Sequence, residues 1–531
     1  MKKHNLEHDL KDQLDQYLQQ HYYPMHMPGH KRRVAVTPDA LLRYDLTEVS
    51  GTDDLHHASG LLREAMARTS ALHGSDRSWY LVNGSTCGNL AGVSAIVPYD
   101  GELIVARNCH RSVFHAIELR HAHPHWLWPS MDPESGIFDS VRPEMVEALL
   151  DEYPASVAVV LTSPSYEGVV SDIRRIADIC HHHGIPLMVD EAHGAHLGLV
   201  PAAGFPDSAI HQGADISVQS AHKTLLGMTQ TAYLHLCGSR VSESAIEEKL
   251  SIFETSSPSY PLMLSLAGCT EWVEREGQTR FMDWAAALRD FDERIRPLRH
   301  LRVLCHGADT IRAHAFYAFD PSKLVIDCSQ TGLSGYALMD LLREHFRYEL
   351  EMAQPGYALA MTGPGDDFAE LRRFAAALRM IDLALDADAE ESMRSGVDAS
   401  EQHVDRSVLK EAVRRACAPE CSLKARIGGG QSSATRVDVL RQSALSGGEM
   451  ALAPCEAVEA AAEMVPFPEL AGRVSGEYVY SYPPGIPILV PGERITEEMV
   501  RYLRTAEQRF DELRYSRSAE ADGRIACLAQ C

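Results

Sequence analysis

The chain has 531 residues, of which 45% are hydrophobic, and a formal net charge of −24 at pH 7. This length predicts about three domain-sized units, or one large α/β domain with a smaller companion. The negative charge argues against nucleic acid as the main partner, no apolar run approaches the roughly 18 residues of a membrane helix, and the amino terminus lacks an apolar signal-peptide core.

Residues 1–44 are predicted to form an N-terminal segment that precedes the main domain. Leucines recur four apart over residues 5–20, which predicts an amphipathic helix. Residues 23–31, Tyr-Pro-Met-His-Met-Pro-Gly-His-Lys, follow as a loop, because proline and glycine interrupt regular structure. The histidines and lysine of this loop are either a ligand cluster or solvated side chains, and their spacing favours solvation.

A hydroxyl-rich turn follows the first predicted strand. An acidic loop over residues 45–56 and a helix over residues 60–73 lead to a buried strand at 79–82, then to Asn-Gly-Ser-Thr-Cys-Gly-Asn at 83–89 and an apolar helix to about residue 97. Backbone N–H groups and hydroxyls at the start of a helix form an anion site. Simple capping of the helix by Ser85 or Thr86 is the alternative, and both roles can hold together.

Apolar strands then alternate with helices. Strands are predicted at 102–106, 156–162 and 185–189, with helices from about 112 to 119 and from 172 to 183, the latter capped by Ser171 and ended by Gly184. This alternation predicts a mostly parallel sheet covered by helices, in which functional residues gather at the carboxyl ends of strands. The residues at or just beyond such ends are Asn83, His110, Ser163, Asp190 and Lys223.

Lys223 stands in an otherwise nearly uncharged stretch, residues 215–230. Ser220 and His222 precede it, and Thr224 follows. A solvated surface lysine is the ordinary interpretation. A buried lysine, by contrast, tends to lose its proton and becomes a nucleophile that can form a Schiff base.

The second half of the chain is predicted as a small C-terminal domain, residues 301–531, after a helical region at 244–300. Strands and helices alternate again over residues 324–385, and a proline-rich stretch at 477–492 precedes a helix at 496–515. Residues 386–448 are rich in Ala, Ser, Gly, Arg and Glu, which predicts an exposed, partly disordered insertion. The 12 cysteines are scattered, as in a reducing compartment, and Cys417 and Cys421 lack a second pair at zinc-site spacing, so we expect a cytoplasmic protein without a metal site.

The strand-end residues together match the needs of pyridoxal phosphate. The cofactor requires a lysine, a buried carboxylate for its pyridine nitrogen, a helix N-terminus for its phosphate and a flat side chain over its ring. Asp190 alone would be interpreted as a helix cap or a metal ligand. Lys223 follows it by 33 residues in a polar strand-end loop, and this pair is much more specific for the cofactor. Imidazoles come from His110, His193 and His222.

Long motifs add a family resemblance. Over residues of about 20–385 and 450–510 the chain closely resembles the short form of the bacterial ornithine/lysine/arginine decarboxylases, which have the aspartate-aminotransferase type (fold type I) of pyridoxal-phosphate α/β fold. The motifs that carry the resemblance are Met-His-Met-Pro-Gly-His-Lys at 25–31, Asp-Leu-Thr-Glu at 45–48, Gly-Thr-Asp-Asp-Leu at 51–55, Val-Asn-Gly-Ser-Thr at 82–86, Arg-Asn-Cys-His at 107–110, Val-Asp-Glu-Ala-His-Gly-Ala-His at 189–196, Gln-Ser-Ala-His-Lys-Thr-Leu at 219–225, Thr-Ser-Ser-Pro-Ser-Tyr at 255–260 and Tyr-Pro-Pro-Gly-Ile-Pro at 482–487.

The resemblance implies a role for each site residue. Lys223 would carry the cofactor, Asp190 would pair with the pyridine nitrogen, and His110 would stack on the ring. His193 would lie beside the phenolic oxygen of the cofactor or support Asp190. The residues that would complete the cofactor site, chiefly around the phosphate, are Ser85, Thr86, Cys87, Ser220 and His222.

The resemblance also implies an assembly. Residues 255–257 would reach the cofactor of a neighbouring subunit, because the family builds its sites at a dimer interface. The sequence shows no counterpart of the N-terminal wing of the large inducible enzymes, so we expect a homodimer or a tetramer rather than a decamer. Ala221 departs from the threonine of many relatives.

The expected activity is decarboxylation of a basic amino acid, with arginine ahead of lysine and ornithine, to a polyamine-type amine. Aminotransfer, or another lyase reaction on the same fold, is the alternative among enzymes. A non-catalytic sensor that keeps the cofactor is a further alternative, although no basic helix-turn-helix segment is evident. The candidate carboxylates for the distal cation of the substrate are Glu477, Glu351, Asp53 and Asp54, and surface solvation is the ordinary alternative for each.

Overall fold

The computed structural model describes residues 19–26, 31, 44–49, 52–132, 135–386, 405–417, 448–481, 485–509, 513–517 and 523–529. The leucines of the helix predicted at 5–20, and residues 27–30 of the loop that follows it, lie outside these ranges. Among the described residues no helix has the length and apolar character needed to cross a membrane.

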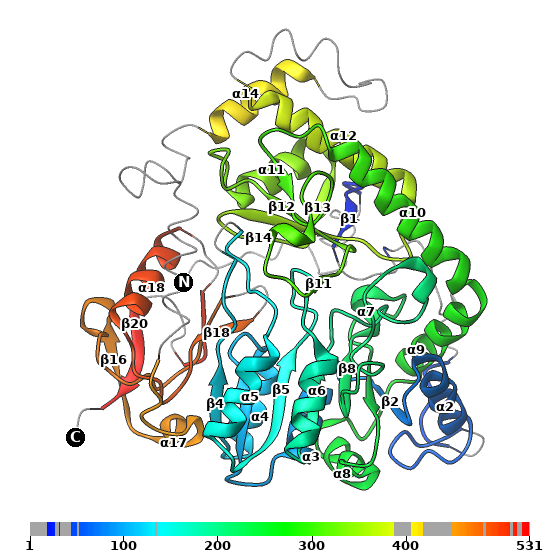
Figure 1. The fold of residues 1–531 in the computed structure, drawn as a ribbon, viewed down its shortest axis with the longest axis vertical. Coiled ribbons are helices and arrows are strands. Elements are labelled where there is room, and N and C mark those ends of the chain that lie inside the picture. Colours follow the sequence, from blue (N-terminus) through cyan, green and yellow to red (C-terminus); the bar gives the residue numbers. More distant parts are fainter. Residues whose placement is uncertain are drawn as a thin grey trace, which may run out of the picture.

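A seven-stranded sheet forms the centre of the large domain (Figure 1). Its strands are all parallel except β9, which runs antiparallel to both of its neighbours. In spatial order they are β2 (Arg77–Leu81), β9 (Ala232–Leu236), β8 (Ile216–Gln219), β7 (Leu187–Asp190), β5 (Ser156–Thr162), β3 (Glu102–Ala106) and β4 (His123–Leu127). The predicted mostly parallel sheet is confirmed, and the carboxyl ends of β2, β3, β5, β7 and β8 lie along one edge.

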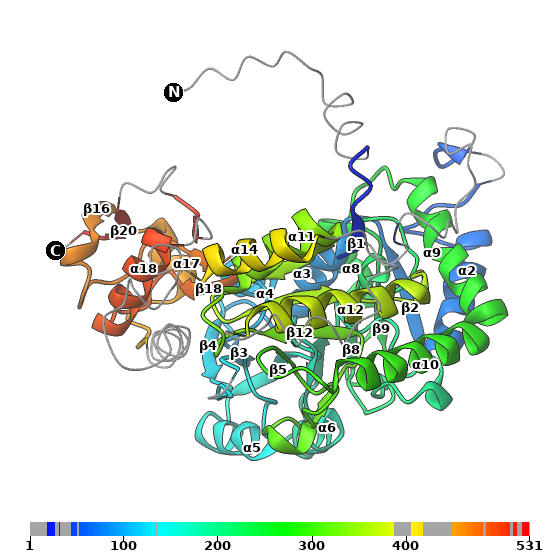
Figure 2. The ribbon, with the colours of Figure 1, turned by 90° about the horizontal axis from the view of Figure 1, so that it is seen from above.

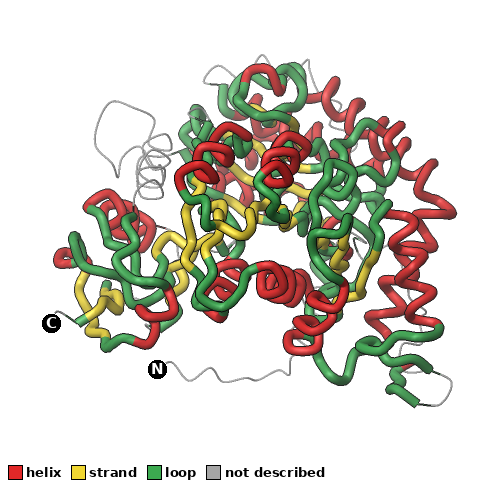
Figure 3. Tube along the Cα trace, turned by 60° about the horizontal axis from the view of Figure 1, so that its bottom comes forward, coloured by secondary structure: helices red, strands yellow, loops and turns green. Residues whose placement is uncertain are grey.

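Helices surround these strands, as Figure 3 shows. They are α3 (Gly84–Ile96), α4 (Arg111–Leu119), α5 (Pro143–Glu152), α6 (Ile173–His182) and α8 (Glu243–Phe253), and α2 (Leu61–His73) and α9 (Tyr260–Trp272) lie beyond β2. Helix α10 (Gln278–Ile295) follows and packs against α12 (Phe368–Ala384). The interrupted helical region at 244–300 is thereby confirmed.

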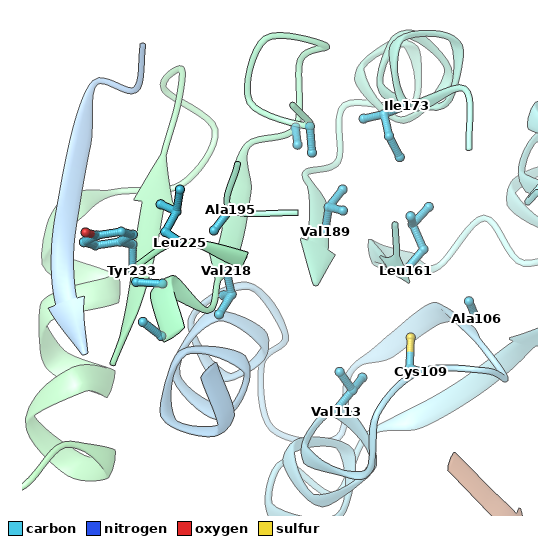
Figure 4. Close-up of a cluster of buried hydrophobic side chains, with 14 of the residues drawn as sticks. Ala106, Cys109, Val113, Leu161, Ile173, Val189, Ala195, Val218, Leu225 and Tyr233 are labelled. Atoms are coloured by element: carbon cyan, nitrogen blue, oxygen red, sulfur yellow. The ribbon is translucent and has the colours of Figure 1, made fainter. Parts of the chain in front are cut away.

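The core lies between the sheet and these helices. Side chains such as Val189, Leu161 and Val218 project from the strands and are almost fully buried (Figure 4). Helix α3 crosses the sheet closely, since a Cβ at Gly88 would lie 2.7 Å from side-chain atoms of both Leu81 and Val218. Glycine at this position therefore brings the N-terminus of α3 close to the strand ends.

Two predicted helix caps are wrong. Helix α3 begins at Gly84 with Asn83 as its N-cap residue, so Ser85 and Thr86 lie inside its first turn instead of capping it. Helix α6 is capped by Asp172, whose carboxylate accepts a hydrogen bond from the backbone of its first turn. The hydroxyl of Ser171 accepts from the backbone of residue 141 instead, because it faces a neighbouring loop.

A second sheet carries the smaller α/β unit. Its order is β10 (Arg302–Val303), β12 (Lys323–Asp327), β15 (Tyr357–Met361) and β14 (Met352–Ala353), with α11 (Gly335–Phe346) and α12 (Phe368–Ala384) packed nearby. Strand β1 (Tyr23–Met25) pairs with β13 (Tyr348–Leu350), so the loop predicted over residues 23–31 is wrong for its first three residues. The expected solvation is wrong for Lys31, which is 2% exposed and donates to the carbonyl of Met361 at 2.7 Å, because it packs against this unit.

The stretch predicted to be an exposed insertion contains a packed helix. Helix α14 (Arg406–Ala416) lies against α11 and α12 (Figure 2), and Leu409 and Val413 are buried. The prediction of an exposed linker is therefore wrong for residues 405–417, and the rest of residues 387–447 lies outside the described part of the chain.

The last unit, residues 448–529, has its own sheets and a separate core cluster. It lies beside the β4 edge of the large sheet (Figures 1 and 2). Its elements are α17 (Pro454–Glu459), β16 (Ala462–Pro466), β17 (Val479–Ser481), β18 (Ile486–Leu489), α18 (Glu497–Arg509), β19 (Leu513–Tyr515) and β20 (Arg524–Leu528). The helix predicted at 496–515 is too long, because residues 513–515 pair with β17 as a strand. The described residues from 448 onward therefore have a core cluster of their own inside the predicted 301–531 unit.

Candidate active site

Lys223 lies just beyond β8, on the short helix α7 (Ala221–Thr224) rather than on a loop. Its amine Nζ is 3.0 Å from Nε2 of His193. Desolvation of the amine by the surrounding protein lowers the pKa of Lys223, and the carboxylates of Asp190 and Glu351 oppose this shift. The side chain is only half-buried. It therefore combines a weakened hold on its proton with access for a reactant, as a nucleophilic amine requires.

His193 follows β7 and is the direct neighbour of Lys223. Burial, together with the charge of Lys223, holds the pKa of His193 well below its usual range. Its ring lies 4.3 Å from that of Tyr166, measured between centroids, at an angle of 52°. The sequence offered two positions for His193, beside the phenolic oxygen of the cofactor or in support of Asp190. The structure does not show the second position, because Nε2 faces the Lys223 amine.

Asp190 ends β7 and is 2% exposed. Its carboxylate accepts a hydrogen bond from the side-chain amide of Asn89 at 2.8 Å and from the backbone N–H of Ala192 at 3.1 Å. Burial raises the pKa of Asp190, while Lys223 and these two donors favour the anion. A buried carboxylate at a strand end, held by fixed donors, is suited to pair with a cationic ring nitrogen.

His110 is the N-cap residue of α4. Its Nδ1 accepts a hydrogen bond from the backbone of Ser112, whose hydroxyl lies 2.8 Å from the same nitrogen. The amide of Asn89 also donates to that hydroxyl, at 2.9 Å. Burial, and then the charge of Lys223, lower the pKa of His110 to about 3. The ring is therefore neutral at physiological pH, with its proton on Nε2.

Asn89 thus links the two sides of the site, and the sequence reasoning missed it. One amide group holds both Asp190 and the hydroxyl that fixes His110. The residue closes the hydroxyl-rich turn, but Asn89 and Asp190 are 101 positions apart in the chain. The position of Asn89 in that turn was the sequence signal that could have assigned it to the site.

The hydroxyls assigned to the phosphate have different surroundings. Ser85 is half-buried and Thr86 is exposed, both in the first turn of α3, where backbone N–H groups lack helical partners. Ser220 is fully buried, and its hydroxyl has no hydrogen-bond partner among the described residues. His222 is half-buried and donates from Nδ1 to the Thr231 carbonyl at 2.9 Å.

An unpaired buried hydroxyl is costly unless a ligand satisfies it. Ser220 and the start of α3 therefore fit the phosphate of pyridoxal phosphate. Cys87 is buried, and burial raises the pKa of its thiol, so it contributes an apolar surface rather than a charge.

Three of the four carboxylates proposed for the distal cation have structural roles. Glu477 accepts hydrogen bonds from two backbone N–H groups of the C-terminal unit. Asp53 holds the start of α2 through the backbone of residues 59, 60 and 62, and Asp54 binds His57. Glu351 differs, because its carboxylate accepts a hydrogen bond from Tyr166, the neighbour of His193, and acts electrostatically on Lys223.

A second lysine, Lys323, is buried beside the site and was not predicted. It is 0% exposed and donates to the carbonyl of His193 at 3.3 Å and to Asp320 at 3.2 Å. Its charge further lowers the pKa values of His193 and Lys223. Glycine at 168 leaves space for its stem, since a Cβ there would lie 2.8 Å from the Lys323 side chain.

Comparison with protein families matches residues 9–366 to the Orn/Lys/Arg decarboxylase major domain and residues 439–513 to the corresponding C-terminal domain. The uncharacterized protein YaaO of Bacillus subtilis is 35% identical over 498 residues, with 92% of each chain covered. The arginine decarboxylases of Halalkalibacterium halodurans and Bacillus subtilis are each 29% identical, over 488 and 485 residues, and the matches cover 90% of this chain and 89% of each relative.

Solved structures give the same fold. The lysine decarboxylase of Francisella novicida superposes with a TM-score of 0.72 at 21% identity, over 91% of this chain and 74% of that one. The constitutive lysine decarboxylase of Escherichia coli gives 0.70 at 20% identity, over 93% and 76%. These likenesses confirm the expected fold class.

Proposed function

The chain belongs to the Orn/Lys/Arg decarboxylase family, and on this premise we propose that it is a pyridoxal-phosphate-dependent decarboxylase of a basic amino acid, with arginine favoured over lysine and ornithine. The observation that carries the proposal is the Lys223 amine, 3.0 Å from His193 and under the field of Asp190. The arginine decarboxylases among the relatives support the preference for arginine.

The residues present would hold the cofactor in a defined way. Lys223 would attach it covalently, Asp190 would pair with its pyridine nitrogen, and His110 would cover one ring face. The first turn of α3 and the Ser220 hydroxyl would hold its phosphate. When bound, pyridoxal phosphate supplies an electron sink that allows the bond between Cα and the carboxylate to break with loss of CO2.

The chain's own side chains would then deliver one proton to the substrate. Cα needs a proton after CO2 leaves, and we propose that the Lys223 amine, whose Nζ is 3.0 Å from Nε2 of His193, would supply it. The pKa values of both groups lie below their usual ranges, so each group holds a proton less tightly than it would in water. The Tyr166 ring packs against His193 and limits how far the imidazole can turn away from the amine.

Glu351 is our candidate for the distal cation of the substrate. Tyr166 donates a hydrogen bond to this carboxylate, and the Tyr166 ring packs against His193, so one side chain separates Glu351 from the neighbour of Lys223. A guanidinium pairs well with a carboxylate through two parallel hydrogen bonds, which agrees with arginine as the preferred substrate.

We further propose a homodimer in the cytoplasm that supplies an amine for polyamine synthesis. The family resemblance, with residues 255–257 reaching a neighbouring site, supports the dimer. The scattered cysteines, 10 of which are free in the described chain, support a reducing compartment.

The test is a substrate panel of arginine, lysine and ornithine with the cofactor-loaded protein, measuring CO2 and identifying the amine product. Agmatine and CO2 from arginine at the highest kcat/KM are the expected result. Transfer of the amino group to a keto acid without release of CO2 would favour the aminotransferase alternative, and binding of cofactor without any turnover would favour a sensor.

A further inference from the structure

A cluster of metal-ligating side chains lies away from the active site, in the loop that follows β10. Cys305, Asp309 and His314 each direct one ligand atom into a common space, and these atoms lie within 4.8 Å of one another. Zinc bonds of about 2.0–2.3 Å imply separations of roughly 3.3–3.8 Å between ligands of a tetrahedral site. Small side-chain rotations would therefore close the cluster around an ion.

His314 is held as a metal-binding histidine usually is. It is fully buried at its ring, and Nδ1 lies 3.3 Å from a carboxylate oxygen of Asp132. That carboxylate is itself fixed by two hydrogen bonds from Ser135. A carboxylate on one imidazole nitrogen orients the ring and leaves the other nitrogen to bind the metal. Here the other nitrogen, Nε2, faces Asp309 at 2.8 Å.

The surrounding loop supplies charge and access. Asp309 also accepts a hydrogen bond from the backbone N–H of Cys305 at 2.7 Å, which holds both ligands in one turn. Arg302 lies 3.9 Å from the other oxygen of Asp309 and pairs mainly with Asp327, at 3.0 Å. Asp309 lines a cavity of about 640 Å³, which gives an ion a route from solvent.

We propose that Cys305, Asp309 and His314 form a binding site for a thiophilic divalent cation of the zinc type, with Asp132 orienting His314 from behind. Thiolate, imidazole and carboxylate are ligands that zinc accepts, and solvent from the cavity would complete a tetrahedral set. On binding, the Cys305 thiol releases its proton to solvent and the sulfur bonds to the ion, with no change of oxidation state. The site would fasten the loop after β10 to the loop that carries Asp132.

Cobalt(II) tests the proposal, because cobalt bound to a cysteine thiolate gives a charge-transfer band in the near ultraviolet. The full-length protein is stripped with a chelator, titrated with cobalt(II), and then with zinc(II) as a competitor. One equivalent should produce the band, and zinc should abolish it. Cys305→Ser should lose the band, while Cys237→Ser, at another partly exposed free cysteine, should keep it.

Two further variants separate the roles. His314→Gln should weaken binding more than Asp132→Asn, which should weaken it about 10–100-fold. Thermal unfolding without metal checks that each variant folds. The proposal is overturned if no band forms at one equivalent, or if Cys305→Ser keeps it, since His314 would then only bridge two carboxylates. Decarboxylase activity plays no part in this readout.

Discussion

Replacement of Arg107 should weaken the attachment of the C-terminal unit to the large domain and lower the free energy of unfolding. The guanidinium is 2% exposed and donates to the carbonyls of Pro487 and Ile488 and to the carboxylate of Glu493, which is fully buried. Three aromatic rings surround it at 5.4–5.5 Å from their centroids, namely Phe114, Trp126 and Trp128. Arg107 thus joins the strand end near His110 to β18, rather than binding cofactor.

The expected loss of stability follows from the Glu493 charge that stays buried after Arg107 is replaced. Arg107→Met keeps most of the stem volume but leaves the Glu493 charge buried. Among the described residues only the backbone N–H of Val490 then donates to it. Breaking one side of a buried pair costs about 3–5 kcal/mol. Adding Glu493→Gln removes the stranded charge, so the double variant should be more stable than Arg107→Met alone.

Urea unfolding followed by tryptophan fluorescence measures this directly, because Trp126 and Trp128 lie against the guanidinium and the chain has only five tryptophans. Comparison of the wild type, both single variants and the double variant gives the coupling free energy. A loss below about 1 kcal/mol for Arg107→Met, or an equal loss with and without Glu493→Gln, would refute the assignment of a buried ion pair.

Three more outcomes are expected. Asn89→Ala removes a hydrogen bond to a charged Asp190, worth about 1.5–3 kcal/mol, and should lower kcat about 10–100-fold, so an unchanged kcat contradicts the bridging role. Glu351→Gln should raise KM for arginine more than it lowers kcat, and a KM equal to that of the wild type would exclude Glu351 from the substrate site. The buried ring of His73 has its pKa lowered to about 3 by burial, from 6.5. The unfolded chain therefore binds a proton there that the folded chain does not, so stability present at pH 7 declines as pH falls from about 6.5 toward 3, by up to about 1.4 kcal/mol per pH unit. His73→Gln should show a shallower decline of Tm over this range, and parallel curves would contradict this.

The elements that the sequence predicts well are those set by local pattern. The strands predicted at 102–106 and 156–162 have the same bounds in the structure. Each is a continuous run of apolar, β-branched residues between turns, and this pattern favours a buried strand. The meeting of His110, Asp190 and Lys223 followed from topology alone, since parallel strands bring their carboxyl ends to one edge.

What the sequence could not supply depends on contacts between distant segments. Arg107 and Glu493 are 386 positions apart, and Lys323 reaches the carbonyl of His193 from 130 positions away. The predicted cap of α6 was wrong for a different reason. The neighbouring residues Ser171 and Asp172 have similar capping propensities, and tertiary packing decides which of them caps the helix. The cluster of Cys305, Asp309 and His314 was missed because three and then four residues between these ligands do not match a recognised zinc-site spacing.

The central claim is that Lys223 carries the cofactor, and its most direct test is the site of covalent attachment. The protein loaded with pyridoxal phosphate is reduced with borohydride, digested and mapped by mass spectrometry. The account predicts the reduced cofactor on the peptide that contains Lys223, and none after Lys223→Ala. Two other lysines of the described chain, Lys31 and Lys323, are more deeply buried, at 2% and 0% exposure. Attachment to either of them, or no attachment at all, would contradict the account.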